Sequence, residues 1–362
     1  MKLAKQIMNE KLIYGIQQIG IGVANADAAF KWYATRLGAD ALIFDDSNEA
    51  TYMAKYMGGK SRRKRALLAL NMQGGGGYEI WQFINRTPSK PKTDFKVGDL
   101  GIQFPFIKTK DVFKTFERLQ KLKENILSEI CEEPDGSKSF YLKDPFDNIL
   151  KVKEFNSWYQ QKKVDVGGVF GASIGVSNIE TSLKLYRDIL GYDTIEFDEI
   201  GFFKDLNALN NGKMKFRRIL LSHSEKRIGG FSKLFGASQI ELIQCLENTP
   251  NIIFKNRYWG DLGYIHLCFD VKNISVLKKE CHEKGAPFQV ISNPSFNMGE
   301  ANGHWGYVED FDGTLIEFIE THKVPLLKKW GININLKNRN PRKPLPNWMI
   351  KGMNLKRVKN FN

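Results

Sequence analysis

Apolar and polar residues alternate in three short runs of the chain, QIELIQ, GYIHLCF and TLIEFIE, and each run carries one ionisable side chain. This alternation predicts β-strands, in which neighbouring side chains point to opposite faces. Apolar residues flank Glu241, His266 and Glu317, so each of the three lies on the face opposite the apolar one. Carboxylate and imidazole donors on three strands suit a divalent metal ion, which makes these residues the first candidates for a functional site.

The hydrophobic pattern repeats along the chain. IQQIGIGVANADAAFKWYATRLGAD predicts a strand, a turn and an amphipathic helix that ends at Gly38, and FGASIGVSNIETSLKLYRDILGYD repeats this order. Both helices stop at Leu-Gly, where Gly provides the left-handed cap. Two further units begin with DLG at Asp99 and Asp261 and close through the hairpin turns DPFDN and DFDGT. The sequence therefore contains four units of strand, helix and strands, arranged as two similar pairs.

Composition places the chain among globular proteins, with 362 residues, 42% hydrophobic and 12% aromatic residues. A chain of this length is expected to form two domains. Its apolar runs are too short for a membrane span, and its N-terminus does not resemble a signal peptide, so we expect a cytoplasmic protein. The four cysteines show no CxxC spacing and are expected to be free thiols.

The net charge of +14 comes mostly from one end of the chain. Residues 323–362 contain eleven of the 54 Lys and Arg and none of the 40 Asp and Glu, which leaves the remainder at +3. A nearly neutral body argues against a dedicated nucleic-acid binder. We expect residues 323–362 to form a basic extension that wraps the second domain, and we expect no membrane or nucleic-acid partner.

The order of these motifs resembles the vicinal oxygen chelate superfamily, which includes glyoxalase I, bleomycin-resistance proteins and extradiol dioxygenases. The resemblance rests on IGV…LYRDILGYD, IELIQ, HLCFDV and YVEDFDGTLIEFIE, and spans residues 14 to 321. It implies an α+β fold in which four βαβββ modules pair into two cupped, eight-stranded domains. With consecutive modules paired, the domains would be residues 12–156 and 168–322, followed by the basic extension 323–362.

The resemblance also implies where a metal would bind, because the family's ligands come from the first and last strands of each module. In the second domain these positions are Glu241, His266 and Glu317, and the fourth falls near Gly171, which offers no ligand.

In the first domain the four matching positions are Gln18, Glu79, Gln103 and Lys151. A protonated Lys cannot be a ligand. We therefore expect this domain to be metal-free, with Lys151 paired to Glu79.

The expected function is that of a metal-dependent lyase or isomerase acting on a small oxygenated substrate. The protein is expected to be a monomer or a homodimer. Glu241 is the candidate base, and His304 is either a second acid or base or an ordinary loop histidine. The donor set suits Zn, Mn, Fe, Co or Ni and does not choose among them. Two alternatives stay open: an Fe(II) dioxygenase of the extradiol or 4-hydroxyphenylpyruvate type, and a non-catalytic protein that sequesters a small molecule.

Overall fold

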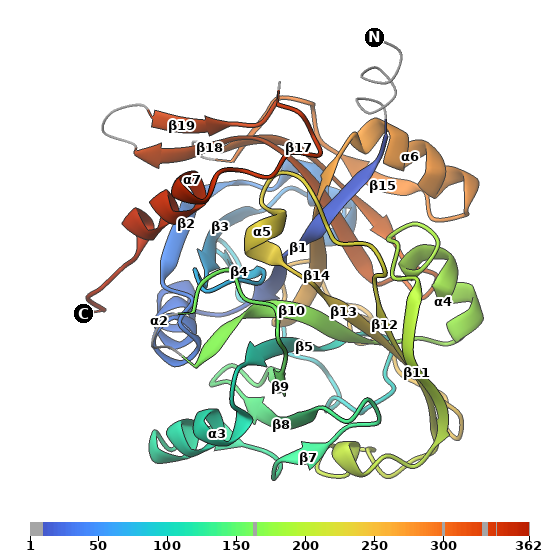
Figure 1. Ribbon diagram of the computed structural model, residues 1–362. Helices are drawn as coiled ribbons and strands as arrows, with labels where there is room; N and C mark the ends of the chain where they lie inside the picture. Colours follow the sequence, from blue (N-terminus) through green and yellow to red (C-terminus); the bar gives the residue numbers. More distant parts are fainter. Residues whose placement is uncertain (1–9, 162–164, 299–300, 328–331, 338, 362) are drawn as a thin grey trace.

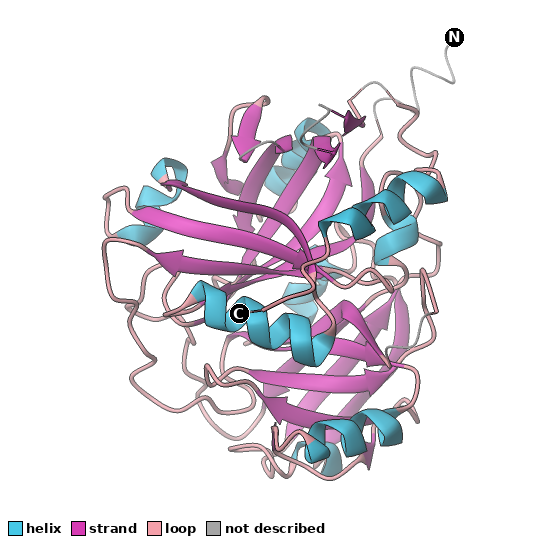
Figure 2. Ribbon diagram, turned by 90° about the vertical axis from the view of Figure 1, so that its left-hand side faces the viewer, coloured by secondary structure: helices cyan, strands magenta, loops and turns pink. Residues whose placement is uncertain are grey.

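The computed structural model describes residues 10–161, 165–298, 301–327, 332–337 and 339–361. Two strongly curved sheets form the body of the molecule, one drawn above the other in Figure 1, and the side view of Figure 2 shows the same two groups of strands. Helices lie outside the sheets. This arrangement confirms the expected α+β fold with two cupped sheets.

The 10-stranded sheet has the order β15-β17-β18-β14-β1-β4-β3-β2, with β16 and β19 added at β17 and β18. Its strands are β1 (Leu12–Gly22), β2 (Ala41–Glu49), β3 (Arg63–Leu70), β4 (Gly77–Phe83), β14 (Gly263–Lys272), β15 (Phe288–Ile291), β16 (Phe296–Met298), β17 (Ala301–Glu309), β18 (Leu315–Leu327) and β19 (Ile332–Asn335).

The 9-stranded sheet has the order β11-β12-β13-β10-β5-β9-β8-β6, with β7 added at β8. Its strands are β5 (Gly101–Thr109), β6 (Asn125–Ile126), β7 (Cys131–Glu132), β8 (Lys138–Lys143), β9 (Ile149–Glu154), β10 (Val166–Gly175), β11 (Thr194–Gly201), β12 (Phe216–Ser222) and β13 (Gln239–Cys245).

One helix follows the first strand of each module, and three of these four helices begin with a side-chain cap. Asn25, Asp111 and Asn178 each accept a hydrogen bond from a backbone N–H of the first turn. The module helices are α2 (Ala26–Leu37), α3 (Val112–Lys121), α4 (Ile179–Tyr186) and α6 (Ile274–Glu283). The other helical segments are η1 (Thr51–Met57), η2 (Lys204–Leu206), α5 (Ser232–Phe235), α7 (Asn347–Gly352) and η4 (Met353–Lys356).

The pairing of the modules differs from the one expected. The first module, β1 to β4, shares a sheet with the fourth, β14 to β18, whereas the second and third modules form the other sheet. In Figure 1 the blue strands accordingly lie beside orange and red ones, and the green strands beside yellow ones. The sheets therefore do not follow the division into residues 12–156 and 168–322, and this part of the prediction is corrected.

Close contacts at the two central strand pairs accompany this arrangement. β1 runs antiparallel to β14, and Gly20 lies opposite His266. A Cβ atom on Gly20 would lie 2.3 Å from the His266 ring, so the fit of these two strands requires glycine there. β10 and β5 pair in the same way, with Ser173 opposite Phe104. In the 10-stranded sheet, β1 thus leaves room at Gly20 for the imidazole of His266 from the fourth module.

The C-terminal extension packs on the 10-stranded sheet. β19 pairs with β18, and Leu345, Ile350 and Met353 are buried in one cluster with Leu68 of β3. It therefore contacts both the first and the fourth module. No helix among the described residues is long and apolar enough to cross a membrane.

Candidate metal centre

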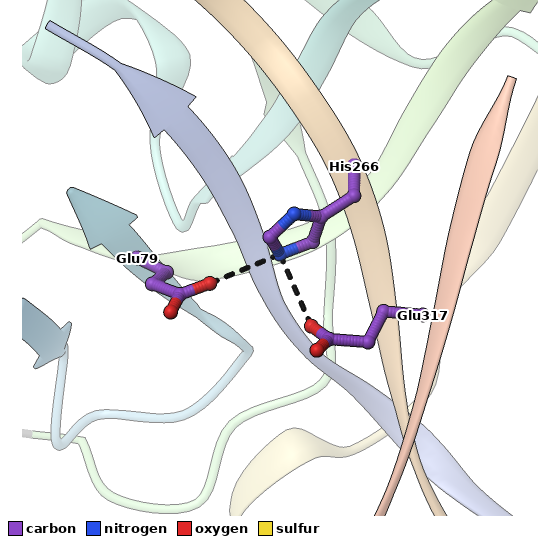
Figure 3. Close-up of side chains that lie close together, drawn as sticks. All are labelled: Glu79, His266 and Glu317. Carbon is purple, nitrogen blue, oxygen red and sulfur yellow. Dashed lines mark ion pairs between the residues drawn. The ribbon is translucent and has the colours of Figure 1, made fainter. Parts of the chain in front are cut away.

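Three ionisable side chains converge inside the 10-stranded sheet (Figure 3). His266 on β14 points between Glu79 on β4 and Glu317 on β18, and its Nε2 atom lies 3.1 Å from the nearer carboxylate oxygen of each. All three residues are buried, and their potential ligand atoms lie within 4.8 Å of one another. The site therefore joins a donor from the first module to two donors from the fourth.

Strand register explains why these side chains meet. β1 lies between β14 and β4, and Gly20 is the partner of His266 on one side and of Glu79 on the other. Cys268 of β14 is in turn the partner of Glu317. Alternation places residues two apart on the same face, so His266 and Cys268 face the same way. The missing side chain at Gly20 leaves the space that the imidazole fills.

The site is electrostatically coupled. Burial alone would lower the pKa of His266, but the nearby carboxylates of Glu317 and Glu79 raise it to about 9. Burial alone would raise the pKa of Glu79, but attraction to the His266 ring lowers it. The Tyr307 hydroxyl lies 3.4 Å from His266 Nδ1 and holds the ring from its other side. Without a cation, a protonated imidazole is what balances the two carboxylates.

The donor geometry fits a divalent cation. Metal bonds of about 2.0–2.2 Å place neighbouring ligand atoms roughly 3 Å apart, which matches the 3.1 Å from Nε2 to each carboxylate oxygen. His266 Nε2 and Glu317 Oε2 are buried and have no hydrogen bond of good geometry. A neutral imidazole and two carboxylates suit Zn, Mn, Fe, Co or Ni.

Gln18 provides a fourth candidate donor. Its Nε2 donates a hydrogen bond of 3.2 Å to Glu79 Oε2, and its Oε1 is buried without a partner among the described residues. An amide oxygen is a competent ligand once it is turned toward a cation. Gln18, Glu79, His266 and Glu317 occupy the four positions at which the family resemblance places ligands.

A cavity opens directly onto this centre. Glu79 and Glu317 lie in its wall. Six aromatic side chains form half of the remaining wall: Tyr52, Trp81, Trp259, Phe296, Trp305 and Tyr307. We call this space the aromatic cavity. A small molecule inside it can reach both carboxylates.

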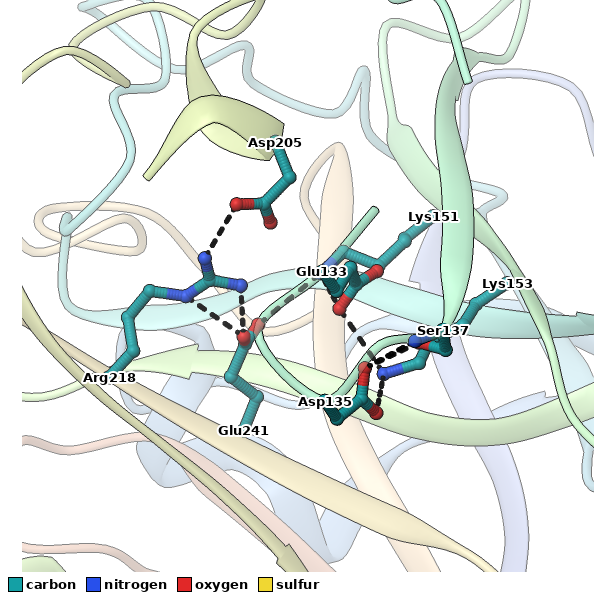
Figure 4. A network of polar contacts seen from close by, with 8 residues as sticks. All are labelled: Glu133, Asp135, Ser137, Lys151, Lys153, Asp205, Arg218 and Glu241. Carbon is teal, nitrogen blue, oxygen red and sulfur yellow. Dashed lines mark hydrogen bonds and ion pairs between the residues drawn. The ribbon is translucent and has the colours of Figure 1, made fainter. Parts of the chain in front are cut away.

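Glu241 lies in the other sheet and does not join His266 and Glu317, which corrects the predicted grouping. It is fully buried on β13, where Arg218 contacts its Oε1 at 2.5 Å and Lys151 lies 3.7 Å from its Oε2 (Figure 4). Burial raises the pKa of Glu241, but Arg218 and Lys151 outweigh this effect and lower it. A carboxylate held by two fixed cations is poorly suited to bind a metal or to act as a base.

The predicted ion pair between Lys151 and Glu79 is likewise wrong, although Lys151 does place a positive charge inside the cup of its sheet. Lys151 pairs with Glu133 at 3.1 Å and approaches Glu241, both within the 9-stranded sheet. Its ammonium also lies about 5 Å from the ring centres of Phe104 and Phe106. A fixed positive charge thus occupies the cup of this sheet.

The register also corrects the match of Gln103 with His266. Gly20 pairs with His266 in one sheet, and Ser173 pairs with Phe104 in the other, so Phe104 is the counterpart of His266. Gln103 instead donates a hydrogen bond to the backbone of Asp99. Aligning the two DLG segments without a gap pairs Phe104 with His266, so the sequence contained this signal.

His304 lies outside the candidate centre. It belongs to β17, where its strand partner is Glu320, while Tyr307 pairs with Glu317. Trp305 and Tyr307 line the aromatic cavity, so alternation directs His304 to the opposite face. The prediction placed His304 in a loop before the last hairpin, and its position within a strand explains the difference.

Comparisons with known proteins agree with this architecture. The sequence profile of the Glyoxalase/Bleomycin resistance protein/Dioxygenase superfamily matches residues 15–152. The chain is similar to the structure of a putative dioxygenase from Bacillus subtilis subsp. subtilis str. 168, with 15% identity, a TM-score of 0.57 and 86% of each chain covered. It is also similar to glyoxalase I from Zea mays, with 13% identity, a TM-score of 0.53, and 88% of this chain and 95% of that chain covered. At these identities the likeness shows a shared fold. No curated protein matches the chain.

Proposed function

Because the chain belongs to the Glyoxalase/Bleomycin resistance protein/Dioxygenase superfamily, we propose that it is a divalent-metal enzyme of the lyase or isomerase type. One observation carries the proposal: three buried donor atoms lie within 4.8 Å of one another beside an open cavity. Gln18, Glu79, His266 and Glu317 would hold the ion. When bound, it would act as a Lewis acid toward adjacent oxygens of a small substrate.

The residues around the centre have distinct roles in this proposal. Glu79 and Glu317 line the cavity, so either carboxylate can take a proton from one carbon of the substrate and return it to the adjacent carbon. This role replaces the one expected for Glu241. Tyr307 orients the imidazole of His266 through Nδ1. The aromatic walls exclude water from the site of proton transfer.

The composition of the donor set favours this chemistry over oxygen activation. Non-haem Fe(II) oxygenases use two His and one carboxylate. Here one His stands with two carboxylates and an amide, and the nearest additional metal-competent side chain on the same strand face is Cys268.

The test is metal analysis of protein purified without added metal or chelator, repeated for His266→Ala. We expect about one equivalent of a divalent metal in the wild type and its loss in the variant. Iron together with oxygen uptake would select the dioxygenase instead. Failure of the wild type to take up Zn, Mn, Fe, Co or Ni under any loading condition would contradict the proposal and leave a metal-free binding protein.

A further inference from the structure

Lys64 is a cation of the aromatic cavity that the proposed chemistry does not use. It lies on β3 between Asn48 of β2 and Phe83 of β4, and its side chain lines the cavity together with Glu79 and Glu317. In the part of the chain that the structure describes, its ammonium group makes no hydrogen bond and no ion pair.

The neighbours of Lys64 in the sequence behave differently. Arg65 points to the outside, where it forms ion pairs with Asp27 and Asp45. Lys60 is exposed at the start of the same basic run. Strand alternation therefore directs one cation of this run inward, toward the candidate metal centre.

The charges around the cavity leave Lys64 available for a ligand. A divalent cation with a neutral imidazole would balance Glu79 and Glu317, and Glu49 at the exposed rim already accepts a hydrogen bond from Ser61. Burial outweighs the attraction of nearby carboxylates and lowers the pKa of Lys64. An anion bound beside the ammonium would add to the attraction that Asp46, Glu79 and Glu317 exert on it, and would offset the cost of its burial.

The cavity walls restrict the shape of such an anion. Six aromatic side chains surround the space, and Tyr52, Trp305 and Phe296 pack edge to face around one another. Aromatic walls of this kind favour flat, apolar ligands that contact ring faces and edges. The candidate donors and Lys64 are the polar groups that would fix the orientation of such a ligand.

We propose that Lys64 is the specificity-determining residue of this site and binds the carboxylate of an aromatic acid that carries a second oxygen next to the carboxylate. One carboxylate oxygen and the second oxygen would face the metal held by Gln18, Glu79, His266 and Glu317, while the other carboxylate oxygen would accept a hydrogen bond from the Lys64 ammonium. The inference rests on the proposed metal-dependent function and adds the substrate class to it.

Salicylate and its neutral analogue salicylamide test the inference as matched probes on Mn²⁺-loaded protein by titration calorimetry. The wild type is expected to bind salicylate at least about tenfold more tightly than salicylamide, because a charge-assisted bond is about twice as strong as a neutral one. Lys64→Met should lower the affinity for salicylate about tenfold and leave salicylamide binding and Mn²⁺ content unchanged, because the carboxylate oxygen on the metal side still favours the anion. Lys64→Arg should retain most of the salicylate affinity, and Lys60→Met should behave as the wild type.

The outcomes separate the two proposals. If the wild type takes up no Mn²⁺, the metal-dependent function fails and the inference falls with it. If the loaded wild type binds neither probe, or binds both equally, the role of Lys64 is overturned while the metal centre stands. An unchanged salicylate affinity in Lys64→Met would overturn it in the same way, and intact salicylamide binding shows that the variant has folded.

Discussion

Exchanging one carboxylate in each sheet tests which modules build the metal centre. Glu79→Gln and Glu241→Gln are the same chemical change at equivalent strand positions, because Glu79 pairs with Gly20 and Glu241 with Ser173. Only Glu79 lies near His266, at 3.1 Å. The structure therefore predicts that Glu79→Gln weakens metal binding and that Glu241→Gln does not.

The expected size follows from linkage between binding and folding. A free metal concentration a thousandfold above Kd stabilises the folded state by about 4.1 kcal/mol. Removing a side chain that only hydrogen-bonds to a metal ligand lowers metal affinity 10- to 100-fold. A ~100-fold loss is therefore a conservative value for removing a metal ligand itself. The metal-dependent stabilisation of Glu79→Gln would then fall to about 1.4 kcal/mol, a loss of about 2.7 kcal/mol. Glu241→Gln should keep the full value.

The assay is urea unfolding of each variant at one fixed free Mn²⁺ concentration and again in EDTA. In EDTA, Glu241→Gln should itself be destabilised, on the order of 1–3 kcal/mol, because Arg218 and Lys151 lose part of a buried partner. The reasoning is refuted if Glu241→Gln loses the Mn²⁺-dependent stabilisation and Glu79→Gln retains it. Equal behaviour of the two variants would refute it as well.

Three further changes probe the packing and the charges. Gly20→Ala places a Cβ 2.3 Å from the His266 ring, so we expect metal affinity to fall at least about tenfold in calorimetric titration, as for the loss of supporting groups. Arg218→Met leaves buried carboxylates without their cation and should lower the free energy of unfolding in urea by about 3–5 kcal/mol. Arg217→Met, which removes the neighbouring exposed ion pair, should lower it by less than about 1 kcal/mol. Burial raises the pKa of Asp270 to about 8 from a usual value near 3.9, so the stability of the wild type falls as pH rises between these values. Asp270→Asn should therefore gain more stability at pH 8 than at pH 5, measured by thermal unfolding. An equal gain at both pH values would contradict this prediction.

The local structure was readable from the sequence because it depends on neighbouring residues. Alternation gave the three strands that carry Glu241, His266 and Glu317 and the face on which each side chain lies. Leu37-Gly38 marked a helix end, and Gly38 adopts the left-handed conformation with φ of 67°. These features are set within a few residues, so a single sequence is sufficient to predict them.

The composition of the site was decided by tertiary structure. All four modules share one pattern of strands and helix, so each could in principle pair with any other, and the sequence alone favoured neighbours. The observed choice brings Glu79 of the first module to His266 and Glu317 of the fourth, and leaves Glu241 with Arg218 and Lys151. Pairing of the first with the fourth module depends on contacts between residues far apart in the sequence, such as Gly20 against His266, and such contacts leave no local periodicity to read.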